Sequence, residues 1–176
     1  TRKLRLKRTS VDRKLTALRR LHKFLVVEGL TAQDPTANLQ SPRPARPLPK
    51  VLSVDQCLAL LAAPDRETPD GLRDAAMLTF LYATGLRASE LVSLQMHSVD
   101  FDRGTVRVRG KGDKDRVVPV ARPALRLVTQ YVEEARGQLI KDPGEQGLFV
   151  TRLGRCMTRM RFHQILKSYL PKAGVP

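Results

Sequence analysis

The sequence predicts a mainly α-helical fold with a small antiparallel β-sheet, the α+β class. Three observations predict this fold. Apolar residues recur at intervals of three and four over most of the chain, and from Val99 this interval changes to two. A third is a pair of short β-branched runs, TVRVR (105–109) and RVVPV (116–120), separated by the glycine-rich stretch GKGDKD. Such a pattern is typical of a β-hairpin.

The first predicted helix runs from Ser10 to Glu28 and ends before Gly29. Its apolar positions have helical spacing and are Val11, Leu15, Leu18, Leu21 and Leu25. Three basic residues lie off this stripe: Arg13, Arg20 and Lys23. They either contact DNA phosphates or form an ordinary solvated face, and the helix alone does not decide between the two.

A proline-rich basic stretch, LQSPRPARPLPK (39–50), follows this helix. Its four prolines exclude a regular helix, so we expect a linker between two domains. Its basic residues Arg43, Arg46 and Lys50 suit contact with DNA. The predicted organisation is therefore a helical part (1–40), a linker (41–50) and a second domain (51–176).

The second domain begins with a capping box of Ser53 and Gln56, which predicts a helix there. The apolar stretch Leu72 to Ala83 predicts a buried helix. Pro119 indicates that the second hairpin strand lies at a sheet edge. The remaining expected elements are a helix from Pro123 to about Gln138, a short strand at GLFV (147–150) and a helix from Thr158 to about Leu170.

The net charge of +15 points to a polyanionic partner. Residues 1–50 hold 13 Lys and Arg against 3 Asp and Glu, which is +10, and the rest of the chain holds +5. Aromatic residues make up 5%, which disfavours recognition of single strands by base stacking. Double-stranded DNA is therefore the expected partner.

Membrane and secreted classes fit poorly. No stretch approaches the roughly 20 apolar residues that span a bilayer, and no membrane partner is expected. The two cysteines, Cys57 and Cys156, have neither metal-ligand spacing nor a disulfide framework. A cytoplasmic protein is the natural interpretation.

The stretch TGLRASEL (84–91) places Arg87 two residues after Gly85, where the buried helix should end and another begin. Glu90 lies within reach of the guanidinium, leaving its other donors free for a phosphate. A surface ion pair is the alternative. Lys111 lies between two glycines at the hairpin tip, where it could reach a DNA groove or belong to a solvated turn. Lys114 follows it and is a further candidate for DNA contact.

Together, LYATGLRASELVSL (81–94) and VRVRGKGDKDRVVPV (106–120) closely resemble the catalytic domain of tyrosine site-specific recombinases, nearest the Xer and phage-integrase branch. The resemblance covers most of residues 31–176, and the first helix resembles the last part of the family's core-binding domain. It implies that Arg87 grips the scissile phosphate, that Lys111 protonates the leaving 5′ oxygen and that Glu90 supports the site. It implies no metal or other cofactor.

The sequence departs from the family pattern in one respect. The family's H-x-x-R motif and nucleophilic tyrosine lie downstream of a segment like SYLPKAGVP (168–176). His22, His97 and His163 are followed three residues on by Leu25, Asp100 and Leu166, and we expect Tyr82, Tyr131 and Tyr169 to serve packing. The chain is therefore expected to be truncated at both ends, to bind duplex DNA without cleaving it, and to be monomeric in solution, although the family acts as a tetramer of homologous subunits.

Several alternatives stay open. The chain is either part of a complete recombinase or a natural short relative that binds without cutting. A non-catalytic DNA-binding module would explain the charge but not the two motifs, and a metal-dependent nuclease would use Asp100 and Asp102. Chromosome dimer resolution and DNA integration are both possible biological roles.

Overall fold

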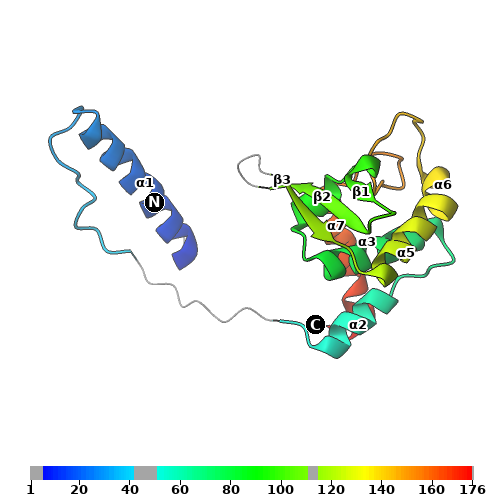
Figure 1. The fold of residues 1–176 in the computed structure, drawn as a ribbon. Helices are drawn as coiled ribbons and strands as arrows, with labels where there is room; N and C mark the ends of the chain where they lie inside the picture. Colours follow the sequence, from blue (N-terminus) through cyan, green and yellow to red (C-terminus); the bar gives the residue numbers. More distant parts are fainter. Residues whose placement is uncertain (1–5, 42–50, 111–114, 176) are drawn as a thin grey trace. The chain divides into compact units, whose positions relative to one another are not determined.

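The computed structural model describes residues 6–41, 51–110 and 115–175. They belong to two compact units, residues 1–50 and 51–176, which are treated separately below. Figure 1 shows that helices dominate and that one small antiparallel sheet lies in the second unit, so the predicted fold class is confirmed. In the described ranges, no helix is both long and apolar enough to cross a membrane.

The first unit consists of helix α1 (Arg8–Val27) and a segment that returns along it. Gly29, with φ 68°, ends the helix as predicted. The guanidinium of Arg19 donates to the Ser41 hydroxyl at 2.7 Å and to the Leu39 carbonyl, which holds the returning segment. Thr36 is buried and donates to the Asp34 carboxylate through its backbone N–H and its hydroxyl, at 2.8 and 2.6 Å.

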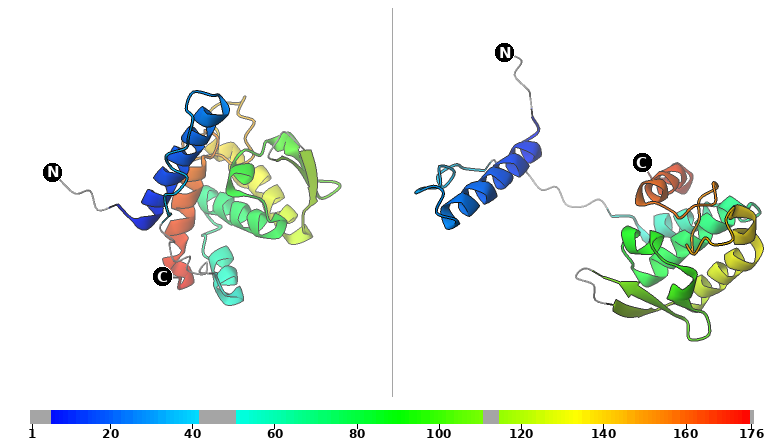
Figure 2. Two further views of the ribbon diagram at one scale, coloured as in Figure 1. Left: turned by 90° about the vertical axis from the view of Figure 1, so that its left-hand side faces the viewer. Right: turned by 90° about the horizontal axis from the view of Figure 1, so that it is seen from above.

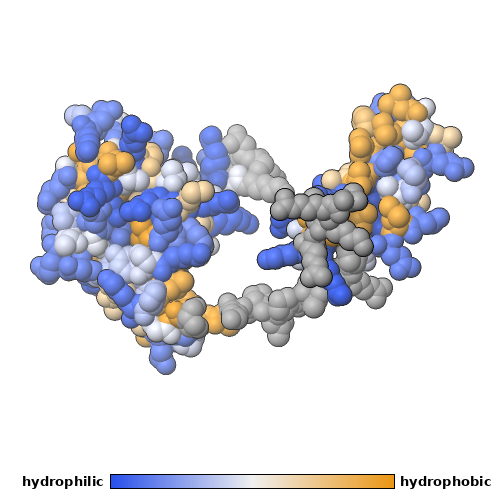
Figure 3. Space-filling model, turned by 180° about the vertical axis from the view of Figure 1, so that it is seen from behind, coloured by the Kyte–Doolittle hydropathy of each residue, from blue (hydrophilic) through white to orange (hydrophobic). Residues whose placement is uncertain are grey.

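The apolar stripe of α1 is largely uncovered. Its spacing is helical, yet the helix contains no buried residue, and Leu18 and Leu21 of the stripe are 45% and 51% exposed, as is the neighbouring Phe24 at 56%. Figure 3 shows this apolar surface on the first unit. The described part of residues 1–50 therefore forms a helix with a shallow apolar face.

The second unit begins with α2 (Val54–Ala62), whose predicted capping box between Ser53 and Gln56 is present. Helix α3 (Pro69–Thr84) begins three residues before the predicted start. Thr68 caps it by accepting from the Gly71 N–H at 3.1 Å, and Pro69 suits the first helical turn. The apolar residues Leu72, Ala75 to Leu78 and Phe80 are buried, as predicted, and the charged pair Arg73 and Asp74 is buried with them.

The sheet has the order β1-β2-β3, with β1 (Val99–Asp100), β2 (Thr105–Arg109) and β3 (Asp115–Pro119) antiparallel. The predicted edge position of β3 is confirmed. The Val120 N–H donates to the Gly104 carbonyl at 2.8 Å, so the nitrogen of the preceding Pro119 faces away from β2 and its missing N–H costs no ladder hydrogen bond.

A continuous helical stretch follows the sheet: α5 (Arg122–Gln130), a π-helical segment η2 (Tyr131–Arg136) and α6 (Gly137–Leu139). The strand expected at GLFV is wrong, because Gly147 and Val150 make only isolated bridges. The segment makes a few backbone hydrogen bonds, such as Leu148 N–H to the Leu94 carbonyl at 2.8 Å, and side chains bind some of its carbonyls. Arg136 donates to the Gly147 carbonyl, and the Tyr131 hydroxyl donates to the Leu148 carbonyl at 3.2 Å.

Helix α7 (Arg159–Tyr169) begins after Thr158, as predicted, and Leu170 is its C-terminal cap. The two views in Figure 2 show α3 between the sheet and α7. The core of the second unit contains the largest fully buried side chains, among them Tyr131, Phe80, Phe149, Met77 and Leu91. Because α3 is packed on several sides, its C-terminal end has a fixed position.

Candidate active site

Arg87 lies at the corner between α3 and the short helix α4 (Ala88–Val92), as the sequence predicts. Gly85 ends α3 with φ 62°, a left-handed conformation that glycine adopts without strain. Arg87 is then extended and serves as the N-cap residue of α4. The corner thus places the arginine at the end of a buried helix while its own side chain stays 72% exposed.

Glu90 is the buried centre of this corner, with 7% of its side chain exposed. Its carboxylate accepts four hydrogen bonds. Arg87 donates from its backbone N–H at 2.8 Å and from Nη1 at 3.0 Å, and Arg116 donates from Nη1 and Nη2 at 3.0 and 2.8 Å. The predicted contact between Glu90 and Arg87 is present, and a second arginine, which the sequence analysis did not identify, joins them.

These contacts keep Glu90 ionised. The hydrogen bonds from Arg116, followed by the one from the Arg87 backbone, lower the pKa of Glu90 to about 2, although burial opposes the shift. The same pairing raises the pKa of Arg116. The cluster therefore carries two positive charges and one negative charge at neutral pH, and the Arg87 guanidinium is its more exposed cation.

The predicted hairpin cations Lys111 and Lys114 lie outside the described residues. The hairpin neck, where β2 ends and β3 begins, is described. There Arg109 Nε lies 3.6 Å from the Asp115 carboxylate, and the next residue, Arg116, contacts Glu90. The neck is therefore joined to the corner that holds Arg87.

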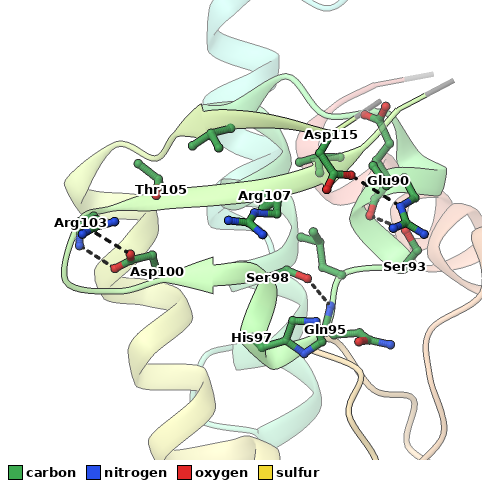
Figure 4. Close-up of a pocket in the computed structure, with 14 residues that line it drawn as sticks. Glu90, Ser93, Gln95, His97, Ser98, Asp100, Arg103, Thr105, Arg107 and Asp115 are labelled. Carbon is green, nitrogen blue, oxygen red and sulfur yellow. Dashed lines mark hydrogen bonds and ion pairs between the residues drawn. The ribbon is translucent and has the colours of Figure 1, made fainter. Parts of the chain in front are cut away.

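A cleft of about 890 Å³ lies along the outer face of the sheet, and Glu90 lines one end of it. Figure 4 shows Arg107 between the strands and the short segment that carries His97 and Ser98. The sequence analysis did not identify this cleft. The signal that could have found it is the alternation in TVRVR, which places Arg107 and Arg109 on the face opposite the buried Val106 and Val108.

The predicted DNA-contacting residues of α1, Arg13, Arg20 and Lys23, are all exposed. They belong to the first unit, whereas Arg87 belongs to the second. Arg43, Arg46 and Lys50 lie outside the described residues. Further exposed arginines that the sequence analysis did not select follow Val150, at positions 152, 155, 159 and 161.

The three tyrosines differ in environment. Tyr131 is fully buried, and burial raises its pKa to about 12. Burial and the nearby Asp74 carboxylate, to which its hydroxyl donates at 3.0 Å, also raise the pKa of Tyr169 to about 12. Tyr82 is 59% exposed on α3. The two raised pKa values disfavour the phenolate form that a nucleophile needs.

Within residues 6–41, 51–110 and 115–175, no group of three or more His, Cys, Asp or Glu side chains is placed to hold a metal ion. Asp100, one of the two carboxylates considered for a nuclease, accepts from the Arg103 N–H at 2.9 Å and pairs with its guanidinium at 3.8 Å. Asp102, the other, is exposed.

The second unit is thus a mainly helical domain in which a β-hairpin neck is joined, through the buried Glu90, to the exposed Arg87. The model of the phage integrase family matches residues 50–176. The chain therefore belongs to the phage integrase family.

Similar proteins agree with this assignment. Tyrosine recombinase XerD of Staphylococcus aureus is 40% identical over 166 residues, which are 94% of this chain and 56% of XerD. The structure of XerA recombinase matches with a TM-score of 0.63 and 25% identity, over 97% of this chain and 56% of XerA. A lambda integrase (75–356) dimer bound to a COC′ core site has the same fold, with a TM-score of 0.71, 14% identity and coverage of 97% and 60%. The chain spans about half the length of the curated relatives it matches.

Proposed function

We propose that this chain is part of a site-specific DNA recombinase. The complete protein would cleave one DNA strand, hold it as a 3′-phosphotyrosine, and rejoin it to a new partner. The observation that carries the proposal is the corner cluster, in which a buried carboxylate orients an exposed arginine. Family membership and the similarity to XerD support it.

In the proposed reaction, Arg87 binds a non-bridging oxygen of the scissile phosphate. Its guanidinium is held by Glu90, so it need not reorganise when negative charge grows on the phosphorus oxygens. Lys111 would protonate the departing 5′ oxygen as a general acid. A tyrosine hydroxyl would attack the phosphorus in line with that oxygen and form the phosphotyrosine bond as the P–O5′ bond breaks.

The 176 residues themselves are proposed to bind duplex DNA and not to cleave it. They contain no H-x-x-R sequence, and two of their three tyrosines have raised pKa values in packed environments. Cations alone stabilise charge but supply no attacking group. The exposed basic residues of α1, with Arg43, Arg46 and Lys50, would contact the phosphate backbone, and Lys114 would contact it beside Lys111.

The proposed partners are double-stranded DNA and further recombinase subunits. The lambda integrase relative is a dimer on its core site, which supports both. We propose a cytoplasmic location, a monomeric state for the 176-residue chain in solution, and Xer-type chromosome dimer resolution or DNA integration as the role. Residues 1–40 would belong to the core-binding domain, residues 41–50 to a linker and residues 51–176 to the catalytic domain.

The experiment uses a duplex selected from a randomised pool by repeated binding to the 176-residue chain, then rebuilt with a nick that traps covalent adducts. We expect a shifted complex in EDTA and no adduct that survives denaturation. Arg87→Ala should weaken the complex, whereas Arg126→Ala, at an exposed position on α5, should change it less. A covalent adduct would show that a tyrosine of this chain is a nucleophile, and cleavage that requires Mg²⁺ would favour the nuclease.

A further inference from the structure

Arg116 contacts Glu90 at the corner but has no role in the proposed reaction. It stands in β3, 26 residues after Glu90, yet it makes the two side-chain hydrogen bonds that lower the pKa of that acid most. Its own side chain is 41% exposed, compared with 72% for Arg87. The bidentate geometry is the strong form of an arginine–carboxylate contact.

The register of the sheet explains why this arginine needs a partner. Arg116 pairs with Val108 and lies on the same face as Val118, the face that packs against the core. The Arg116 side chain is only partly exposed there, so a nearby anion stabilises its charge. Glu90 provides that anion at 2.8 Å, and Ser93 closes the local turn by donating to the Glu90 carbonyl at 2.9 Å.

The charge count gives Arg116 a second role. Glu90 carries one negative charge, and Arg87 and Arg116 carry one positive charge each, so the cluster has a net charge of +1. Without Arg116, the Glu90 carboxylate would pair with Arg87 alone and neutralise it. An approaching phosphate would then meet a net charge of zero.

We propose that Arg116 is a positioning residue that keeps the Arg87 guanidinium available to a DNA phosphate, by taking up the charge of Glu90 and fixing the start of β3 against α4. This inference rests on the proposed function. In that function Arg116 acts through Glu90 and Arg87, since each of its terminal nitrogens donates to the Glu90 carboxylate.

The charged groups that act on Glu90 come from two elements. Arg87 faces it from the corner and Arg116 from β3. Arg109, Asp115, His97 and Asp100 line the same cleft. Helix α7 also packs on α4, and it carries Arg159, Arg161, His163 and Lys167.

The test measures duplex affinity for the 176-residue chain and its variants. Arg116→Ala should weaken binding about tenfold, the effect of one charge-assisted contact, and Arg116→Lys should retain more of the affinity because it keeps the charge. In an Arg87→Ala background, Arg116→Ala should cause little further loss. Adding Glu90→Gln to Arg116→Ala should restore part of the affinity, because the carboxylate that neutralises Arg87 is gone. Arg126→Ala is the control for losing one positive charge.

Two results would overturn the proposal. If Arg116→Ala lowers duplex affinity by the same factor in the Arg87→Ala background as in the unsubstituted chain, Arg116 contacts DNA itself. A double variant, Arg116→Ala with Glu90→Gln, that binds no better than Arg116→Ala alone would mean that Arg116 acts only as a brace.

A DNA-free measurement separates this inference from the proposed function. The Glu90 carboxyl carbon should titrate at a higher pH in Arg116→Ala, and the Arg87 Nε resonance should shift in that variant and not in Arg126→Ala. If these NMR changes occur but the unsubstituted chain fails to bind duplex DNA, the proposed function is wrong and the coupling within the cluster stands. An unchanged Glu90 titration would contradict the coupling itself.

Discussion

Helices α1 and α3 differ in both apolar pattern and environment: α1 has one apolar stripe among basic residues, whereas α3 is apolar over most of its length. In α3, residues 71–78 and Phe80 are buried, whereas α1 contains no buried residue in the described part of the chain. The buried helix fixes Arg87 at its C-terminal end, and the uncovered one presents Arg13, Arg20 and Lys23 to solvent. The spacing of apolar residues predicts where a helix forms. How far that helix is buried decides whether it can hold a reactive side chain in one orientation or only contribute positive charge.

The largest expected effect tests this contrast with two matched substitutions. Phe80→Ala, at a fully buried position, should lower the free energy of unfolding by about 3–5 kcal/mol, and Phe24→Ala, 56% exposed, should change it by less than about 0.5 kcal/mol. The chain has no tryptophan and its three tyrosines lie at 82, 131 and 169, so tyrosine fluorescence in a urea titration reports on the second unit. If Phe24→Ala lowered the free energy of unfolding measured by tyrosine fluorescence, the apolar face of α1 would have to pack on that unit.

A second prediction concerns the pH dependence of the corner. The pKa of Glu90 falls from an ordinary 4.5 to about 2 on folding, so its contribution to stability is complete above about pH 5 and is lost as the pH falls from 4.5 towards 2. The difference in unfolding free energy between the unsubstituted chain and Glu90→Gln, roughly 1–3 kcal/mol at neutral pH, should disappear over that range.

The matched control for this prediction lies in the first unit. Hydrogen bonds from Thr36 also lower the pKa of Asp34. Asp34→Asn should therefore leave the tyrosine-detected unfolding unchanged at every pH. If Glu90→Gln were still less stable than the unsubstituted chain at pH 2, the variant would have lost packing and not a charge interaction.

The two helix ends provide a smaller test. Gly85 and Gly29 have φ values of 62° and 68°, and an added Cβ would meet no atom within 4 Å at either position. Alanine should therefore cost about 1–2 kcal/mol of backbone strain at each. Circular dichroism should detect both losses, and tyrosine fluorescence should detect only Gly85→Ala. If the two substitutions lower the free energy of unfolding by different amounts, contacts beyond the local backbone hold one of these turns.

The smallest effect is expected from the uncovered helix. Arg20→Ala should weaken duplex binding a few-fold at low salt and reduce the slope of log affinity against log salt by about 0.9, the value for one phosphate contact. The loss should be similar for every duplex sequence tested. A slope equal to that of the unsubstituted chain would place Arg20 on a solvated face.

Much of this contrast follows from local chemistry. The Ser53 capping box, Gly85, Pro119 and the alternating strand pattern each specify a conformation through neighbouring residues, and the structure agrees with all four. Helix α3 begins three residues before the predicted start, because its first turn is set by the Thr68 cap and Pro69 and not by the apolar residues that follow.

The errors occurred where distant residues decide the structure. GLFV has the composition of a strand, but Arg136 and Tyr131 bind its Gly147 and Leu148 carbonyls, and no local pattern indicates this. Arg116 was missed for the same reason, since its partner is 26 residues away. A usable signal existed: Arg116 alternates with Val118 and Val120 on one strand face, and a charge among inward-facing valines requires a buried counterion.

The outward-facing nitrogen of Pro119 has a consequence for self-association. An open edge strand offers a template on which a second chain can add a strand, and this is a common start of aggregation. Here the ring removes one donor from that row, and charged Asp115 and Arg116 begin the strand. Edge-to-edge polymerisation is thereby opposed at β3, and Pro119→Thr would return the donor and increase light scattering on storage at high protein concentration.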